Sequence, residues 1–471
     1  MVAAGLSAQT LNVNIGEVTY AHQAAQTGDM VYTDGTTLTI QGKVYNLGEI
    51  DNITINQTEV PDNTVSVEYN GSSAHVVVAG NLASRLDVQS TGADVSVVAG
   101  LDVTEEIVYT LSGSSTDGSF YMDGEAKASL VLNALNLTNA DGGVITIDNG
   151  KRIAVTVKGN NVLADGADGQ QKACMFINGH VELDGSGTLT LTGNTKHAYF
   201  SDEYTHIMPG FGKLTVTGAV GDGIHVNQYL RIDGGNLTVN SVGDGIDVGA
   251  NLKGEEYDGQ LFINGGTIKV NVTGSAAKGI KADTDMTITD GDVDVKTTGD
   301  AYYDAAEADI TSSSAMKPDG AFKMEGGKVK LMSTGASGKG LNVTNDITIS
   351  GGSMEIVTTG VVYKYGTLDS KPHGMKTDNN ITIDGGTVIV AASPTKGTAF
   401  KADLDLTING GQVLGFGGKE SVPTGGTQNY STSSGVNVAG GSELNYNGII
   451  YSVPSEYNNS SAYVLVSTPD M

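Results

Sequence analysis

Apolar and polar residues alternate along most of this chain in short runs, and these runs recur as units. Within one unit, apolar residues stand at every second position in three short runs, for example Met286 and Ile288 in the second run and Val293 and Val295 in the third. A side-chain period of two indicates β-strands with one buried face. Seven units align on an opening apolar residue: Ile224, Ile246, Ile280, Met316, Leu341, Met375 and Phe400.

A small turn, usually Gly-Gly, follows the opening residue at the same spacing in every unit except the one at Ile246, which carries an insertion. Three strands per unit predict a right-handed parallel β-helix, a solenoid whose coils stack about 4.8 Å apart. Composition supports an all-β fold, because 66 of 471 residues are Gly, only 8 are Pro and Trp is absent. This much Gly with so little Pro suits tight turns at regular intervals.

The repeat also suggests how the chain is divided. We expect the β-helix to span 66–415, with an N-terminal β cap over 10–65 and a C-terminal β cap over 416–471. Caps are expected because an open stack of strands needs its edges covered. Residues 1–9 look like the remnant of a secretion signal, with small residues before a cleavage point at Ala8. An exported protein is therefore expected, whether extracellular, surface-bound or periplasmic.

Charge narrows the choice of partners. The chain has 26 Lys and Arg against 53 Asp and Glu, a net charge of −27. Nucleic acid and anionic membrane surfaces would be repelled, because phosphate binding depends on clustered Lys and Arg. No apolar run is long enough for membrane insertion. The single cysteine, Cys174, excludes an intramolecular disulfide and is expected in the core. The oligomeric state is left open.

The outward-facing positions of the repeat form two neighbouring columns. The position after each opening residue holds His225, Asp247, Lys281, Lys317, Asn342, Lys376 and Lys401, which we call the lysine column. Two residues further on, Asp predominates. One interpretation is a charge-compensated, solvated sheet, because exposed ion pairs contribute little. The other is a polar track for a linear polymer, with Lys281, Lys317, Lys376 and Lys401 as carbohydrate-binding residues.

Two spacers between units, 296–315 and 357–374, are longer than the others and are expected to leave the same corner of the solenoid. They carry Tyr302, Tyr303, Tyr363 and Tyr365. Tyrosine rings stack on the apolar faces of pyranoses, and loops elaborated on one face of a repeat array are commonly its binding edge. A carbohydrate-binding site is thus predicted here, with an ordered surface loop as the alternative.

Carboxylates in two places suit calcium, which takes oxygen ligands. One set, in the first long spacer, is Asp300, Asp304, Glu307 and Asp309. A second set comes from the Gly-Asp-Gly turns and a nearby carboxylate: Asp222, Asp244 and Asp247. Calcium is the expected cofactor, although no EF-hand spacing appears. His197 and His206, which lie close in sequence, could mark a catalytic patch or an ordered loop with incidental histidines.

The segments 278–283 and 383–388, with the acidic pair Tyr303-Asp304, resemble a bacterial family of secreted carbohydrate-binding (pectin- and cellulose-binding) β-helix proteins. Members of this family are similar in fold to calcium-dependent pectate lyases. The resemblance covers about 105–415 and implies binding of plant cell-wall polysaccharide, including acidic pectic polymers, without established catalysis. It does not assign ligand residues.

Three functions follow from these observations. The first is a secreted or surface carbohydrate-binding protein whose loops calcium organises. The second is a polysaccharide lyase that cleaves polyuronate by β-elimination, with Lys281, Lys317 or Lys376 as the base. The third is a structural or adhesive solenoid without a small ligand. No sequence motif for a serine hydrolase, a phosphate-binding loop or a zinc protease was found in the chain.

Overall fold

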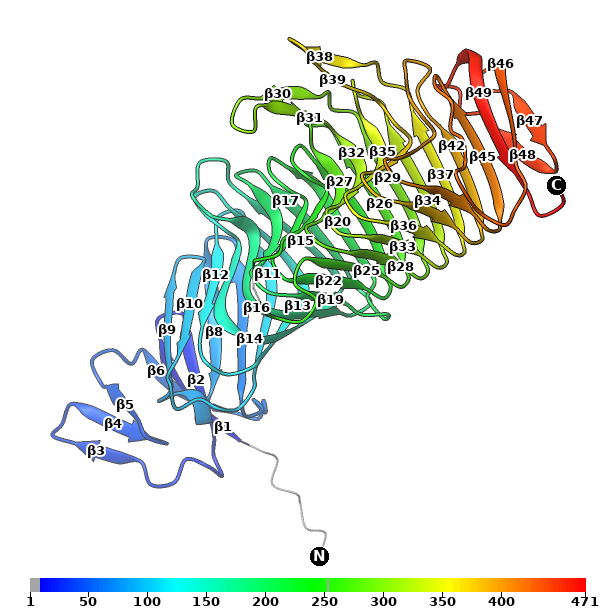
Figure 1. Cartoon of the computed structure of the whole chain (residues 1–471). Helices are drawn as coiled ribbons and strands as arrows, with labels where there is room; N and C mark the ends of the chain where they lie inside the picture. Colours follow the sequence, from blue (N-terminus) through cyan, green and yellow to red (C-terminus); the bar gives the residue numbers. More distant parts are fainter. Residues whose placement is uncertain (1–8, 252–253) are drawn as a thin grey trace, which may run out of the picture. The chain divides into compact units, whose positions relative to one another are not determined.

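The computed structural model describes residues 9–251 and 254–471, and β-strands account for nearly all of its regular structure (Figure 1). The described residues include one short 3-10 helix, Gly80–Leu82. The all-β class is therefore confirmed, and most strand pairs are parallel. Among the described residues, no helix has the length and apolar character needed to cross a membrane. Most of the expected secretion-signal remnant, residues 1–8, lies outside the described residues.

Contacts divide the chain into two compact units. The first comprises the chain up to Thr195 together with Phe200–Asp202. The second comprises Lys196–Tyr199 and Glu203–Met471. β18 (His197–Ser201) spans this boundary. The predicted domain limits at 66 and 415 differ from this division and stay predictions.

The first unit changes from antiparallel to parallel pairing along the chain. β1 pairs with β2 and β6 in antiparallel fashion, whereas β11, β13 and β15 pair in parallel, as do β12, β14 and β16. Cys174 is fully buried here, as expected, and burial raises the pKa of its thiol. The strands are β1 (Thr10–Ile15), β2 (Val18–Gln23), β3 (Val31–Thr33), β4 (Thr37–Ile40), β5 (Lys43–Asn46), β6 (Asn52–Asn56), β7 (Thr64–Asn70), β8 (Ser73–Ala79), β9 (Leu86–Thr91), β10 (Asp94–Ala99), β11 (Ile107–Ser115), β12 (Ser119–Asp123), β13 (Ala128–Asn139), β14 (Ile145–Lys158), β15 (Asn160–Asp165), β16 (Ala173–Asp184) and β17 (Thr188–Gly193).

The second unit contains three ladders of parallel strands, and each repeat contributes one strand to each ladder. The first ladder is β21 (Ile224–Val226), β24 (Ile246–Val248), β27 (Lys278–Ala282), β32 (Ser314–Pro318), β35 (Lys339–Val343), β40 (Met375–Thr377) and β43 (Phe400–Ala402). The second is β19 (Thr205–Ile207), β22 (Tyr229–Ile232), β25 (Gln260–Ile263), β28 (Met286–Ile288), β33 (Phe322–Met324), β36 (Ile347–Ile349), β41 (Ile381–Ile383) and β44 (Leu406–Ile408). The third is β20 (Lys213–Ala219), β23 (Asn236–Ser241), β26 (Thr267–Val272), β29 (Asp292–Thr297), β34 (Lys328–Ser333), β37 (Ser353–Thr358), β42 (Thr387–Ala391) and β45 (Gln412–Gly417).

The register of the first ladder confirms the predicted alignment of the units. Ile224 faces Ile246, Ile246 faces Ile280, and the pairing continues in the same register through the opening residues Met316, Leu341, Met375 and Phe400. Every one of these side chains is buried. Since a fully buried Leu, Ile, Phe or Met contributes about 1.5–3 kcal/mol, the inner column stabilises the stack and fixes its register.

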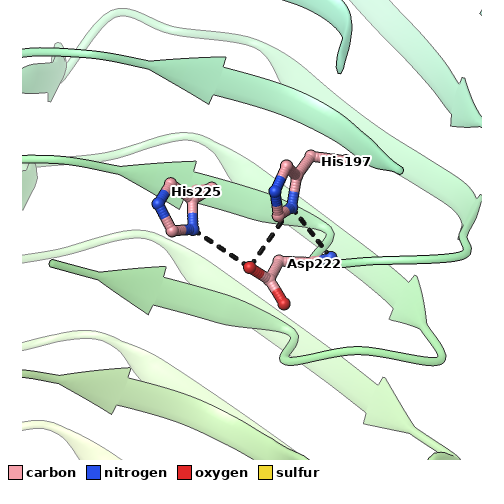
Figure 2. A group of neighbouring side chains, drawn as sticks. All are labelled: His197, Asp222 and His225. Carbon is pink, nitrogen blue, oxygen red and sulfur yellow. Dashed lines mark hydrogen bonds and ion pairs between the residues drawn. The ribbon is translucent and has the colours of Figure 1, made fainter. Parts of the chain in front are cut away.

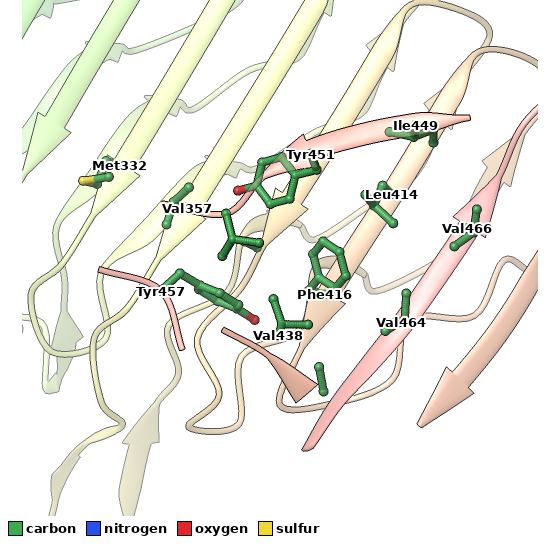
Figure 3. Close-up of a cluster of buried hydrophobic side chains, with 13 residues drawn as sticks. Met332, Val357, Leu414, Phe416, Val438, Ile449, Tyr451, Tyr457, Val464 and Val466 are labelled. Atoms are coloured by element: carbon green, nitrogen blue, oxygen red, sulfur yellow. The ribbon is translucent and has the colours of Figure 1, made fainter. Parts of the chain in front are cut away.

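The last ladder strand is covered by antiparallel strands from the C-terminal residues. β49 (Asn459–Ser467) pairs with β45 and with β46 (Ser431–Val438), and β47 (Glu443–Tyr446) pairs with β48 (Ile449–Ser452). Figure 3 shows the buried cluster that they form around Phe416, Tyr451 and Tyr457. The Tyr457 hydroxyl donates a hydrogen bond to the Ala392 carbonyl at 2.9 Å.

Candidate functional site

A column of polar side chains runs along one corner of the second unit, immediately before the first ladder. Each member precedes a Gly or Ala, and backbone hydrogen bonds link successive members, for example from Gly223 N–H to Asp244 O (2.9 Å) and from Gly245 N–H to Lys278 O (2.9 Å). We call this set the polar column: His197, Asp222, Asp244, Lys278, Ser314, Lys339, His373 and Thr398.

The small residue after each member reflects close packing at this corner. A Cβ added at Gly279 would collide with Val295 of the third ladder, and one added at Gly340 would collide with Ile356. Ala occupies the same position after Ser314 and Thr398. The corner therefore brings the backbone of the first ladder close to the core, and the polar side chains of neighbouring strands lie in register.

Four lysines line one cleft at the middle of the polar column. The cleft has a volume of about 550 Å³, and carboxylates from the two long spacers also line it. The charged lining residues are Lys278, Lys317, Lys339, Lys376, Asp304, Glu307, Asp309 and Asp369. Lys317 and Lys376 belong to the lysine column and pair with Asp319 and, at 2.5 Å, with Asp378.

Lys339 is the most deeply buried of these lysines. Its Nζ donates hydrogen bonds to Ser312 Oγ at 2.6 Å and to Ser370 Oγ at 3.2 Å. Burial, followed by the charges of Lys376, Lys278 and Lys317, lowers the pKa of Lys339 to about 7. The pKa of Lys278 is also lowered, mainly by burial. The cleft thus holds ammonium groups that an anionic ligand would stabilise.

The same column becomes acidic beyond Lys278. A second cleft, of about 380 Å³, is lined by Asp222, Asp244 and Tyr302, and it shares Lys278 and Thr311 with the first cleft. Burial raises the pKa of Asp244 to about 6, and the charges of Asp222 and Asp247 add to this effect, whereas the backbone N–H of Lys278 opposes it. The two clefts adjoin at Lys278 and Thr311, and we call them together the groove.

Two histidines contact the acidic end of the column (Figure 2). Asp222 Oδ2 lies 3.2 Å from His197 Nδ1 and 3.0 Å from His225 Nδ1. His225 Nδ1 is also 3.1 Å from Asp247 Oδ2. Burial alone would lower the pKa of His225, but hydrogen bonds to Asp222 and Asp247 outweigh it and raise that pKa to about 9. Burial opposes ionisation of Asp222, but its contacts with the two histidines hold its pKa below the usual range.

Each of the two long spacers folds into an antiparallel hairpin. The first consists of β30 (Tyr302–Asp304) and β31 (Asp309–Thr311), and the second of β38 (Tyr363–Tyr365) and β39 (Leu368–Ser370). The rings of Tyr303 and Tyr365 stack with centroids 3.9 Å apart. The prediction that the two spacers lie side by side is therefore confirmed. Because each ring covers one face of the other, at most one face of each is left for a sugar.

The structure brings some predicted residues together and separates others. Lys281 lies outside the lysine cleft and pairs with Asp247 at 3.0 Å and Asp283 at 2.8 Å, while Lys401 lines a separate cavity of about 540 Å³. Asp300 Oδ1 accepts a hydrogen bond from the Ala336 backbone N–H, and Asp300 does not line the lysine cleft with the other spacer carboxylates. Of the predicted second carboxylate set, Asp222 and Asp244 are adjacent, since Asp222 Oδ1 accepts the Asp244 N–H at 2.8 Å.

Sequence reasoning missed Lys278, Lys339 and the role of His225. A signal for the lysines exists, because Lys278 and Lys339 both stand in a Lys-Gly-apolar triplet at the same point of the repeat. His197 and His206 lie on different strands, with His197 on β18 in the polar column. His206 lies on the second ladder, and its Nε2 is 2.6 Å from Asp233 Oδ2.

The second unit is thus an all-β scaffold with two adjoining clefts lined by charged side chains. In a comparison with known protein families, a model described as "Carbohydrate-binding domain-containing protein" matches residues 98–361 and 320–421 of the chain. These matches span more than half of the chain, so the chain belongs to this family of carbohydrate-binding domain proteins.

A relative from Acetivibrio thermocellus, also described as a carbohydrate-binding domain-containing protein, is 28% identical over 172 residues. The match covers 35% of this chain and 55% of the relative, so the chain spans about half of that protein. Among solved structures, a polysaccharide lyase-like protein from C. thermocellum matches with a TM-score of 0.42 and 21% identity, over 55% of this chain and 96% of that one.

Proposed function

We propose that this protein binds an acidic polysaccharide in the groove along the polar column, with its anionic groups against Lys278, Lys317, Lys339 and Lys376. The main observation in support of this proposal is that these four lysines line one cleft of a chain with a net charge of −27. A neutral glycan needs no such cluster, whereas a polyuronate needs local cations to offset the field of the protein. The membership in a carbohydrate-binding family supports a polysaccharide partner.

The proposal includes the architecture that holds the groove. We propose that the three ladders of the second unit close into a right-handed parallel β-helix, since every repeat contributes one strand to each ladder in the same order. Such a solenoid would be rigid enough to hold the groove open along several sugar residues. A pectic polymer, encountered outside the cell by an exported protein, is the substrate class we favour.

We propose a calcium-binding site only at the spacer carboxylates. Asp304, Glu307 and Asp309 line the lysine cleft and supply the oxygen ligands that calcium prefers. Part of this oxygen set is already used, since Asp304 Oδ1 accepts the Ala306 N–H and Asp309 Oδ1 the Ile310 N–H. A calcium ion held by the remaining oxygens would bridge the protein to a uronate carboxylate.

Removing two lysines of the cleft should weaken binding of an acidic polymer. We expect the double variant Lys317→Ala/Lys376→Ala to bind polygalacturonate about tenfold more weakly or worse, because hydrogen bonds between charged groups contribute about 1.5–3 kcal/mol each. Isothermal titration calorimetry at low salt measures this. Lys323→Ala is the matched control, since Lys323 lies on the second ladder, pairs with Glu325 and does not line the cleft.

The same titration in EDTA separates the lysines from calcium. We expect EDTA to lower the affinity of the native chain and the lysine substitutions to lower it further. Binding unchanged by EDTA would remove calcium from the proposal. Equal affinity of the double variant and the native chain would refute the lysine cleft as the binding site.

A lyase is the second candidate function, and the buried amine of Lys339 favours it. An amine with a pKa of about 7 accepts a proton near neutral pH, as the base of a β-elimination must. It would take the proton α to the uronate carboxylate, the C4–O bond would break, and a neighbouring ammonium would return a proton to the leaving oxygen. Lys281 is not suited to this role, because contacts with Asp247 and Asp283 outweigh burial and raise its pKa.

Ultraviolet absorbance during incubation with polygalacturonate tests this candidate. A lyase would produce a rising absorbance from the unsaturated product, with a rate that increases as Lys339 loses its proton around pH 7. Lys339→Met should abolish the rise and Lys323→Ala should leave it unchanged. A flat trace for the native chain across this pH range, with and without calcium, would exclude the lyase and leave a binding protein.

A further inference from the structure

The acidic end of the polar column contains a compact group of side chains with metal-ligand chemistry. His197, Asp222 and His225 each offer a ligand atom, and these atoms all lie within 4.8 Å of one another. Figure 2 shows both imidazoles turned toward the Asp222 carboxylate. Neighbouring strands bring the three residues together, because β18 carries His197 and pairs with β21. His225 is on β21, and Asp222 stands two residues before that strand begins.

Asp247 extends the group by a second carboxylate. It faces His225 in the register of β21 and β24, and its Oδ2 is 3.1 Å from His225 Nδ1. All four side chains are largely shielded, with exposed fractions of 7% for His197, 16% for Asp222, 18% for His225 and 12% for Asp247. The second cleft, which Asp222 lines, gives an ion access from solvent.

The spacing within the group suits a small divalent ion. Two ligands that each lie about 2.0–2.1 Å from a tetrahedral zinc ion are themselves about 3.3 Å apart. The contacts from Asp222 Oδ2 to the two histidines measure 3.2 and 3.0 Å, so an ion could be held after small side-chain movements. His197 Nδ1 also lies 3.0 Å from the Asp222 backbone nitrogen, and metal ligation would replace this contact.

The donor set does not fit calcium, the ion that the sequence predicts at Asp222, Asp244 and Asp247. Calcium takes six to eight oxygen ligands, whereas two imidazole nitrogens stand among these carboxylates. The Asp247 carboxylate is further engaged by Lys281 Nζ at 3.0 Å. Imidazole with carboxylate favours zinc, nickel, copper and related ions.

We infer that His197, Asp222 and His225, with Asp247 completing the set, form a binding site for a divalent transition metal of the zinc class. The inference does not depend on the lysine cleft, because none of these residues lines it. Its position beside the second cleft places the ion at one end of the groove.

Titration of the metal-free full chain with Co²⁺ and Zn²⁺ tests the site. We expect stoichiometric binding, visible Co²⁺ absorption of the intensity typical of four-coordinate ions, and displacement by Zn²⁺ but not by millimolar Ca²⁺. His197→Asn and His225→Asn should each weaken Zn²⁺ binding roughly tenfold or more. His206→Asn is the matched control, because His206 forms a His–Asp pair with Asp233 outside the group.

Three outcomes would overturn the inference: no Zn²⁺ binding by the native chain, binding that survives both histidine substitutions, or displacement of Co²⁺ by Ca²⁺ as readily as by Zn²⁺. Thermal unfolding of each variant reports whether it is folded. If His197→Asn does not fold, His225→Asn decides alone, since His225 is the less buried of the two histidines.

Discussion

Lys339→Met is expected to make the protein more stable at neutral pH. Lys339 has a pKa of about 7 in the folded chain, against 10.5 for an ordinary lysine, because burial opposes its charge. Its ammonium donates hydrogen bonds to oxygens of Ser312, Ser337 and Ser370. Methionine is of similar length and needs no hydrogen bonds, so it removes the penalty. At about 1.4 kcal/mol per pKa unit, the gain is on the order of a few kcal/mol.

The pH dependence of stability should change in the same variant. Between pH 7 and 10.5 the unfolded chain holds a proton on this lysine that the folded chain does not, so stability rises with pH over this range. Below about pH 7 both states are protonated and the full penalty applies. The free energy of unfolding of the native chain should therefore rise from pH 7 to 10. In Lys339→Met this rise should be smaller.

Urea unfolding of both chains at pH 7 and pH 9 measures the difference. Lys323→Met is the control, since Lys323 has an exposed side chain and should change stability by only about 0.5 kcal/mol. A Lys339→Met variant less stable than the native chain at pH 7 would contradict the assignment of a penalised amine. Greater stability combined with weaker polygalacturonate binding would show that the lysine is retained for function at a cost to the fold.

Phe416→Ala should destabilise the C-terminal part of the second unit strongly. Phe416 is fully buried in the cluster of Figure 3, where its ring lies 5.9 Å from that of Tyr451 and 5.8 Å from that of Tyr446. Removing a buried phenylalanine side chain leaves a cavity and costs about 3–5 kcal/mol. This cluster joins the last parallel strand, β45, to the antiparallel strands that cover it.

Chemical denaturation and hydrogen exchange together check this effect. We expect a lower free energy of unfolding and faster amide exchange in β45 and β49 than in β27. Ile450→Ala serves as the control, because Ile450 lies in the β47–β48 hairpin that packs against Phe416, yet 63% of its own surface is exposed. Unchanged exchange in β45 would mean that the cluster does not hold this edge, and the predicted C-terminal cap would lose its physical basis.

Much of the repeat could be predicted because side-chain alternation reports burial directly. The opening residues from Ile224 to Phe400 pair in the predicted register, since a slip of one residue would turn an apolar column outward. The two long spacers could be placed together because they occupy the same point of the repeat, and the stacked rings of Tyr303 and Tyr365 confirm this placement. The lysine column also forms, with Lys317, Lys376 and Lys401 each paired to the Asp two residues on.

The site itself could be predicted only in part. Lys317 and Lys376 were found, but Lys281, in the same column, is held by two carboxylates outside the cleft. Lys339 was missed, because the sequence shows neither how deeply a corner position is buried nor which neighbours accept its hydrogen bonds. Asp222 and Asp247 were expected to share a metal with Asp244, yet the contacts place His225 between them.

Local sequence patterns were enough to predict the repeat strands, their register and the faces that they bury, because these follow from a period of two and from small residues at tight turns. Which polar side chains meet across neighbouring strands depends instead on tertiary contacts. Those contacts depend on how each connection turns at the corner and on how much solvent remains there. Lys339 and His225 therefore differ sharply in pKa from what their residue types suggest, and no local pattern in the sequence carries that information.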